Sequence, residues 1–361
     1  MPASPRASDD PFGTGALTDV AGLRVGHHQR IGRGWQTGTT VVLALDGAVA
    51  AVDVRGGGPG TRETDALDAR NLVDRIHAVC LTGGSAYGLA AADGVMAHLE
   101  RKRLGIVVGP EPQHVVPVVP TAVIFDLGRG GGFGNRPDAG FGERAASAAR
   151  LRNVARGAVG AGTGARSGGM QGGVGMASSV VMLGGRAVTV AALAVVNSVG
   201  SAIDPASGLP WVTHPDLRRP SNGDRQRWAT AVAPPEPPSA PPLNTTIGVV
   251  ATDARLSRPE VGRLALSAHD GLARAIRPAH LLVDGDTVFG MSTGGVALVE
   301  TEPAFVRDPA SRTAALNELF AAAAQVFAMA CTDGILTAHT IGPLPAYRDL
   351  CPTAFRRTRS S

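Results

Sequence analysis

The sequence contains few cysteines, and their positions fit neither a disulfide framework nor a structural zinc site. The three cysteines, Cys80, Cys331 and Cys351, are odd in number and lack CxxC spacing. A protein stapled by disulfides or by a structural zinc ion would show paired or regularly spaced cysteines. A reducing cytoplasm is therefore the compartment that we expect.

Lysine is almost absent, and this scarcity bears on nucleic-acid binding. Lys102 is the only lysine, so the formal net charge of +4 rests on arginines that are scattered along the chain. A nucleic-acid binding protein would instead show a basic stripe with interleaved aromatic residues. The nine histidines form neither an HExxH motif nor a cluster with metal-ligand spacing. We expect no nucleic-acid partner, no metal ion and no cofactor.

Long apolar runs are also missing. Residues 1–12 are rich in proline, serine and aspartate without the apolar core of a signal peptide, and no uninterrupted apolar stretch is long enough to cross a bilayer. We therefore expect neither export nor a membrane partner. With 361 residues and 44% apolar content, the chain can bury the core of one large domain or of two ordinary ones.

Glycine, by contrast, is abundant, with 48 residues that fall mostly at the ends of apolar runs. Such positions serve tight turns and close backbone approaches. The glycine-rich stretch 160–175 does not match a phosphate loop, since it has no GxxxxGK[ST] pattern and its GxGxxG lacks the expected acidic partner. Residues 83–87 miss the GxSxG nucleophile elbow, because Tyr87 occupies the last glycine position.

The hydrophobic pattern predicts alternating strands and helices. Asp46-Gly47 between two apolar runs is a strong hairpin signal. The predicted elements up to the middle of the chain are strands at 39–45 and 48–54, a helix at 65–76, a strand at 78–81, an alanine- and glycine-rich helix at 85–99, an irregular edge strand at 115–125 and a buried strand at 187–196.

The proline-rich segment 204–242 is predicted to be flexible and irregular. Long irregular segments inside compact domains are usually functional or disordered. After it the pattern predicts β-α-β-α, with strands at 245–251 and 287–292 and helices at 259–276 and 314–331.

Asn244-Thr245-Thr246 stands at the junction between this irregular segment and the next buried strand. A hydroxyl directly after a peptide bond can attack the preceding carbonyl, so Thr245 is a candidate for self-cleavage after Asn244. Its freed α-amine, with a pKa of about 7.7–8.0, could then act as the base for its own hydroxyl. The alternative is an ordinary strand start, since asparagine favours turns and threonine favours strands.

Three further polar residues are candidates for the same site. Asp284 and Asp286 flank a glycine just before a predicted strand, where alternate residues face one way and could hold the Thr245 amine. Asn197 follows the strand at 187–196 and could donate its side-chain amide to an oxyanion. A solvated Asp-Gly turn and a turn asparagine are the alternatives.

With these residues assembled, the chain resembles the self-processing L-aminopeptidase/D-esterase family, which includes β-aminopeptidases, an amidase of carbapenem biosynthesis and endo-type 6-aminohexanoate oligomer (nylon) hydrolases. The similarity extends nearly from end to end, over segments 17–27, 52–65, 81–95, 122–126, 160–178, 194–200, 244–254 and 284–293. The resemblance implies an α/β fold, an αββα sandwich like that of N-terminal-nucleophile hydrolases. It also implies a single domain of two autoprocessed chains, 1–244 and 245–361, assembled as a homotetramer.

Residue by residue, the resemblance assigns the nucleophile to Thr245, with the cut at Asn244-Thr245, and the oxyanion contact to Asn197. Asp284 and Asp286 match the paired acidic positions of the nylon hydrolases, whereas the aminopeptidase branch has Ser-Gly-Glu there. Phe125 stands where several members have tyrosine, and Gln171 where many have lysine, so two polar donors are absent. Beyond what the resemblance assigns, we expect supporting roles for Thr246, Phe125, Gln171 and the backbone amides near Gly83 and Gly84.

These observations predict a cofactor-free amidohydrolase that acts on peptide-like or ω-amino-acid amides, small or oligomeric. A stereoselective aminopeptidase or D-Ala-type esterase is one alternative. Another is a non-catalytic protein on the same scaffold that binds an anionic small molecule at helix starts beside the glycine-rich loops.

Overall fold

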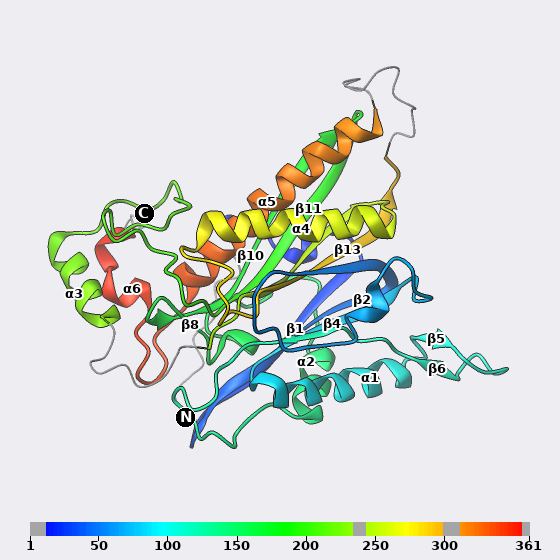
Figure 1. Cartoon of the computed structure of the whole chain (residues 1–361), viewed down its shortest axis with the longest axis horizontal. Helices are drawn as coiled ribbons and strands as arrows, with labels where there is room; N and C mark the ends of the chain where they lie inside the picture. The colour runs from blue at the N-terminus through cyan, green and yellow to red at the C-terminus, as the bar shows by residue number, and fades with distance from the viewer. Residues whose placement is uncertain (1–11, 234–242, 299–310, 356–361) are drawn as a thin grey trace.

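The computed structural model describes residues 12–233, 243–298 and 311–355, which form four layers, helix, sheet, sheet and helix (Figure 1). Among the described residues the main sheet has nine strands in the order β10-β11-β12-β13-β2-β4-β7-β3, with β1 also paired to β2. The predicted αββα sandwich is confirmed, and it forms a single domain. Its principal strands are β1 (Leu23–Gly32), β2 (Trp35–Val54), β4 (Ile76–Thr82), β10 (Gly173–Leu183), β11 (Arg186–Val196), β12 (Ile247–Ala254) and β13 (Thr287–Val296).

The 20-residue strand β2 joins the two layers of the sandwich. Its first part pairs with β1 and β4, and its last part, from Val49 to Val54, pairs antiparallel with β13. The hairpin predicted at Asp46-Gly47 is therefore wrong. Gly47 has a φ of +75° within an irregularity of the β2–β4 pairing, so the left-handed glycine makes a bulge instead of a turn.

The two sheet layers enclose an apolar core to which alternate positions of the strands contribute. Residues of one parity on β11, such as Leu193, face this core with Val249 and Phe289, while their neighbours face the outer helices. Alternation of this kind is the period of a strand buried on both faces. The buried strand predicted at 187–196 is thus confirmed.

Helices α4 (Arg258–Ala275) and α5 (Arg312–Thr337) cover the outer face formed by β10 to β13 (Figure 1). Ser257 and Glu260 form a capping box at the start of α4, which supplies partners for its first amide groups. By length and composition α5 is the one described helix apolar enough to cross a membrane, but 72% of its most apolar window is buried inside the protein, as in a core helix. The predicted C-terminal β-α-β-α order is confirmed.

Helices α1 (Ala91–Arg101) and α2 (Ala139–Ser147) cover the opposite outer face (Figure 1). A Cβ on Gly94 would lie 1.7 Å from the carbonyl oxygen of Ala139, so the two helices cross in close contact that only glycine permits. The helix predicted at 65–76 is wrong. Only Asp65–Leu67 forms a 3-10 turn. Leu67 and Ile76 are buried in the core, but Leu72 between them is 87% exposed, so the apolar residues do not share one helical face.

The remaining elements are short and lie between the principal ones. The predicted irregular segment 204–242 contains the helix α3, while its proline tract, residues 234–242, lies outside the described residues. These elements are β3 (Thr61–Arg62), β5 (Ile106–Val107), β6 (Val115–Val116), β7 (Thr121–Val123), β8 (Arg166–Ser167), β9 (Met170–Gln171), α3 (Asn222–Val232), α6 (Tyr347–Leu350) and 3-10 helices at Leu17–Asp19, Ser85–Ala90, Gly160–Gly162 and Pro352–Ala354.

Candidate active site

Strand register brings the predicted residues to one edge of the sheet. β12 pairs parallel with β13, with Ile247 opposite Thr287, so the residues before both strands lie side by side and Asn244 pairs with Asp284. β11 pairs antiparallel with β12, which places Asn197, just after β11, beside Thr245. The site is therefore built at the ends of three strands, and it brings together residues near 197, 245 and 285 that are far apart in the sequence.

The Thr245 hydroxyl lies against the peptide bond that precedes it. Thr245 is 5% exposed, and its Oγ1 donates to the carbonyl oxygen of Asn244 at 2.5 Å. The same carbonyl oxygen accepts the backbone N–H of Gly285 at 3.1 Å, and the Thr245 N–H donates to the carbonyl oxygen of Asn197 at 2.6 Å. The hydroxyl, the carbonyl and a donor to that carbonyl are thus held together in the uncut chain.

Gly285 approaches Thr245 so closely that a side chain has no room. A Cβ at this position would lie 2.8 Å from Thr245 Oγ1 and 2.7 Å from the carbonyl oxygen of Gly58. Only glycine lets the backbone N–H reach the Asn244 carbonyl without displacing the hydroxyl. This explains the glycine between the two acidic residues.

Asn197 presents one free donor to the site. Its Oδ1 accepts from Arg129 Nη1 at 2.7 Å and from the backbone N–H of Arg166 at 2.9 Å. Two donors on one atom identify that atom as the oxygen, so the amide nitrogen Nδ2 must point the other way. Nδ2 is buried and has no hydrogen-bond partner among the described residues. A buried donor of this kind is what stabilisation of an oxyanion requires.

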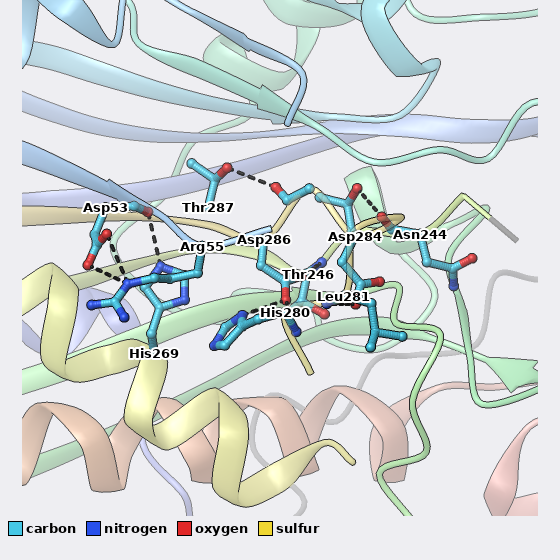
Figure 2. Close-up of polar contacts among 12 residues, drawn as sticks. Asp53, Arg55, Asn244, Thr246, His269, His280, Leu281, Asp284, Asp286 and Thr287 are labelled. Atoms are coloured by element: carbon cyan, nitrogen blue, oxygen red, sulfur yellow. Dashed lines mark hydrogen bonds and ion pairs between the residues drawn. The ribbon is translucent and has the colours of Figure 1, made fainter. Parts of the chain in front are cut away.

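Asp286 is fully engaged in the uncut chain. Its Oδ1 accepts the backbone N–H of Thr246 at 2.7 Å, and its Oδ2 lies 2.8 Å from His280 Nδ1 and accepts the His280 N–H at 3.2 Å (Figure 2). Asp286 therefore positions the start of β12 and does not bond to Thr245 directly.

Asp284 keeps one oxygen free. Its Oδ2 accepts the backbone N–H of Leu281 at 2.9 Å (Figure 2), whereas Oδ1 is buried without a hydrogen-bond partner in the described part of the chain. Burial raises the pKa of Asp284, the Leu281 N–H opposes this rise, and the negative charge of Asp286 adds to it. Asp284 is thus a carboxyl group with a raised pKa and an unused acceptor beside the candidate nucleophile.

The glycine-rich turn after β2 holds the acidic turn in place through its backbone. Arg55 N–H donates to the carbonyl oxygen of Asp286 at 2.9 Å, and Gly58 N–H donates to that of Asp284 at 2.8 Å. A Cβ on Gly56 would lie 2.3 Å from the Asp284 carbonyl oxygen. The glycines predicted to allow close backbone approach do so here.

Two of the predicted supporting residues lie at the site. Thr246 Oγ1 is buried and without a partner among the described residues, next to Asp286. Phe125 lines a pocket of about 140 Å³ that also includes Ser85, Asn244 and Thr245. Its ring offers this pocket an apolar wall.

The other supporting residues do not reach the site. Gln171 Nε2 lies 3.1–3.3 Å from the carbonyl oxygens of Gly162, Thr163, Ala165 and Gly172, so it ties the glycine-rich turns together. The Gly83 N–H donates to the Gly38 carbonyl at 2.9 Å, and the Gly84 N–H to Asp126 at 2.7 Å. The structure therefore corrects the supporting role given to Gly83 and Gly84, because both amides already have acceptors.

Arg129 was not predicted from the sequence. Its guanidinium donates to Asn197 Oδ1 at 2.7 Å, to the Leu243 carbonyl oxygen at 2.6 Å and to Asn244 Oδ1 at 2.9 Å. Burial lowers the pKa of Arg129 to about 10, so it stays positively charged at neutral pH. It is one arginine among many in the sequence, and no motif marks it.

His280 and His269 were also missed. The two rings meet edge to face with centroids 5.0 Å apart, and His269 Nε2 lies 3.0 Å from the carbonyl oxygen of Asp53 (Figure 2). Burial lowers the pKa of His269. In the part of the chain that the structure describes, no three His, Cys, Asp or Glu residues are grouped so that they could hold a metal ion.

Comparison with known proteins gives a consistent result. Residues 15–344 match the family model "Peptidase family S58". An "Uncharacterized aminopeptidase" of Mycobacterium tuberculosis (strain ATCC 25618 / H37Rv) is 49% identical over 350 residues, which cover 94% of this chain and 99% of the relative. The "6-aminohexanoate-oligomer endohydrolase" of Kocuria sp. (strain KY2) is 33% identical over 297 residues, 78% of this chain and 76% of the relative.

Solved structures share the fold. The β-aminopeptidase of a Burkholderia species has a TM-score of 0.65 at 23% identity, with 95% of this chain and 93% of that chain covered. The L-aminopeptidase D-Ala-esterase/amidase from Ochrobactrum anthropi, described as a variant of the Ntn hydrolase fold, has a TM-score of 0.65 at 20% identity, with 97% and 92% covered.

Proposed function

Because this chain belongs to peptidase family S58 and is a hydrolase of amide bonds, we propose that Thr245 is its nucleophile and that the chain exposes it by cutting itself after Asn244. The observation that carries the proposal is the position of Thr245 Oγ1, 2.5 Å from the carbonyl oxygen of the preceding peptide. The N–H of Gly285 on that same oxygen supports it.

Self-cleavage proceeds in two balanced steps. Thr245 Oγ attacks the carbonyl carbon of Asn244 and loses its proton, while the C–N bond breaks and the Thr245 nitrogen gains a proton, which leaves an ester. The Gly285 N–H stabilises the negative charge on the carbonyl oxygen during the attack. Water then hydrolyses the ester, freeing the Asn244 carboxylate and a Thr245 residue with its own α-amine.

In turnover the same oxygen attacks the substrate amide. The Thr245 α-amine takes the hydroxyl proton and passes it to the leaving amine. The free Nδ2 of Asn197 donates to the substrate oxyanion. The unpaired oxygen of Asp284 accepts from the Thr245 amine, while Asp286 keeps the start of β12 in register.

The substrates that we propose are peptide-like or ω-amino-acid amides. The names of the relatives, an aminopeptidase and an endohydrolase of 6-aminohexanoate oligomers, support this class. A stereoselective aminopeptidase or D-Ala-type esterase is the second candidate, supported by the fold shared with the Ochrobactrum enzyme. We also propose a cytoplasmic location. A tetramer of processed units is proposed as well, and light scattering of the purified protein would test it.

Intact mass measurement tests the self-cleavage. Wild-type protein should convert from a chain of 36.7 kDa into two fragments, and N-terminal sequencing of the smaller one should begin at Thr245. Thr245→Ala should stay intact, while Thr246→Val should still be cut at the same bond. A smaller fragment that begins at Thr246, or a cut in Thr245→Ala, would assign the nucleophile elsewhere.

A substrate panel tests the function. Processed protein should hydrolyse at least one of p-nitroanilide amides, β-peptides and 6-aminohexanoate oligomers, and Thr245→Ala none. A protein that binds such compounds without turnover would instead be the non-catalytic binder of the same scaffold.

A further inference from the structure

The guanidinium of Arg129 binds the chain on the acyl side of the proposed cut. Two of its three acceptors, the Leu243 carbonyl oxygen and Asn244 Oδ1, belong to the two residues that precede Thr245. The third is the Asn197 oxygen, whose amide nitrogen is the proposed oxyanion donor. Arg129 thus contacts both Asn197, the proposed oxyanion donor, and the two residues whose acyl group Thr245 would carry in the ester.

The chemistry of self-cleavage makes these contacts relevant to turnover. The ester formed between Asn244 and Thr245 Oγ is an acyl-enzyme in which the upstream chain is the acyl group. An acyl-enzyme formed from a substrate has the same bond at the same oxygen. The residues that surround Leu243 and Asn244 in the uncut chain therefore mark where a substrate acyl group will lie.

We propose that Arg129 is a substrate-binding residue that selects acyl groups bearing a carbonyl oxygen one residue upstream of the scissile bond. The inference rests on the proposed function and adds a substrate class to it. Once the ester is hydrolysed and residues 243 and 244 withdraw, Arg129 loses two of its three acceptors. A substrate whose scissile residue is N-acylated, or lies inside a longer chain, supplies a new acceptor in the position of the Leu243 carbonyl oxygen.

A free α-amine is disfavoured at the same place. The amide nitrogen of Asn244 is bonded to the Leu243 carbonyl carbon, so an unacylated substrate would place its ammonium group beside the Arg129 guanidinium. The Asn244 N–H donates to the Val283 carbonyl oxygen at 3.3 Å, so this ammonium group would keep one acceptor, but it would meet the positive charge of the half-buried Arg129 and offer it no carbonyl oxygen. Asp126 is the nearby carboxyl group, and its two oxygens accept from Thr37 Oγ1 and from the Gly84 N–H instead of from a substrate amine.

The side chain of the acyl residue is read as well. Asn244 Oδ1 accepts from Arg129, and Asn244 Nδ2 donates to the Arg166 carbonyl oxygen at 3.0 Å. One acceptor and one donor complement a carboxamide. Among acylated substrates, those with asparagine at this position are therefore expected to react faster than those with alanine.

Matched substrates test the proposal on processed wild-type enzyme. N-acetyl-asparagine p-nitroanilide and asparagine p-nitroanilide differ only by the acetyl carbonyl. A hydrogen bond to a charged group predicts a kcat/KM about 10- to 100-fold higher for the acetylated compound. N-acetylasparagine should inhibit more tightly than free asparagine by a similar factor. Equal rates, or a preference for the free amine, overturn the proposal.

Variants at Arg129 separate binding from a structural role. Arg129→Met should lower kcat/KM for the acetylated substrate and bring the ratio of the two substrates close to one, while Arg129→Lys should retain part of the preference. Arg152→Met is the matched control, since Arg152 is exposed outside the site, and its ratio should equal that of wild type. Rates are expressed per cleaved chain, measured by intact mass. An equal loss on both substrates in Arg129→Met would contradict a role in selection.

The two proposals fail in different ways. If no preparation is cleaved at Asn244-Thr245 and no substrate turns over, the proposed function is wrong. If wild type is cleaved and turns over both substrates without regard to the acetyl group, only the role of Arg129 is wrong.

Discussion

Gly285 and Thr245 are so close that a β-carbon on the glycine would lie 2.8 Å from the threonine hydroxyl oxygen, while the glycine N–H and that hydroxyl donate to the same carbonyl oxygen, that of Asn244. The acidic turn therefore contacts the Asn244 carbonyl oxygen through the backbone N–H of Gly285, and not through the carboxylates of Asp284 and Asp286.

Gly285→Ala should impair self-cleavage. The added methyl must displace either the Thr245 hydroxyl or the backbone of Gly58, and overpacking of this kind costs about 1–3 kcal/mol, or roughly a 10- to 100-fold lower cleavage rate if the strain falls on the reacting groups. The rate is measured by intact mass over time.

Gly262→Ala provides the matched control for this substitution. A Cβ at Gly262, on α4, meets only the Ala51 Cβ at 3.8 Å. It should leave cleavage unchanged and stabilise the protein by about 0.5–1 kcal/mol. Equal cleavage rates in both variants would show that close approach at Gly285 has no part in the reaction.

Asn197→Asp should abolish the oxyanion contact with little change in shape. The new carboxylate still accepts from Arg129 and Arg166 through one oxygen, but the second oxygen replaces the free amide donor. We expect kcat of cleaved protein to fall about 10²- to 10³-fold. A circular dichroism spectrum like that of wild type confirms that the fold is kept, and a kcat within a few-fold of wild type refutes the assignment.

Asp284→Asn should change both activity and the pH dependence of stability. Asparagine can still accept the Leu281 N–H, but it no longer carries the charge that holds the Thr245 ammonium, so kcat should fall. The pKa of Asp284 in the folded state is raised above its ordinary 3.8. The folded wild-type protein is therefore most stable while Asp284 is protonated, and it loses stability as pH rises through the raised pKa.

Chemical denaturation at several pH values tests the sign of this effect. The stability of Asp284→Asn relative to wild type should increase from pH 3.5 upward, by roughly 1.4 kcal/mol for each unit by which the pKa is raised. A relative stability that falls with pH would mean that the carboxylate is stabilised in the folded protein.

His27→Asn should flatten the loss of stability in mild acid. Burial lowers the pKa of His27 from 6.5 to about 4, and its Nδ1 bonds to Thr40 Oγ1 at 2.9 Å. Because the folded state holds His27 neutral, the free energy of unfolding falls by on the order of 2–3 kcal/mol as pH drops from 6.5 towards 4. Urea unfolding of wild type and variant between pH 4 and 7 measures it, and parallel curves would show that His27 does not titrate in this range.

The sequence predicts the proposed catalytic residues better than their surroundings. Thr245, Asn197 and Asp286 each stand next to a strand whose apolar run is plain in the sequence, and strand register then brings them together. Arg129 and His280 occupy loops, where position depends on long-range packing that no local pattern reports, and His269 lies on α4 without a motif that marks it. The residues that the sequence leaves out are therefore those held by tertiary contacts alone.

The two errors in secondary structure have related causes. Asp46-Gly47 has the composition of a hairpin, but both halves of β2 find partners on other strands, so the glycine serves a bulge. Residues 65–76 have helical spacing, yet Leu67 and Ile76 are buried in the core while Leu72 between them is exposed. In both places tertiary contacts override a correct reading of local preference.

The order β11-β12-β13-β2 fixes what happens to the molecule after a cut at residue 244. β12 and β13 belong to the downstream piece, yet each is hydrogen-bonded to a strand of the upstream piece, so the two polypeptides remain interlocked through a shared backbone ladder. Neither could complete the sandwich alone. Once denatured, the clipped enzyme would have to reassemble from two molecules instead of one, and its recovery would depend on protein concentration, which makes activation a step that unfolding does not readily reverse.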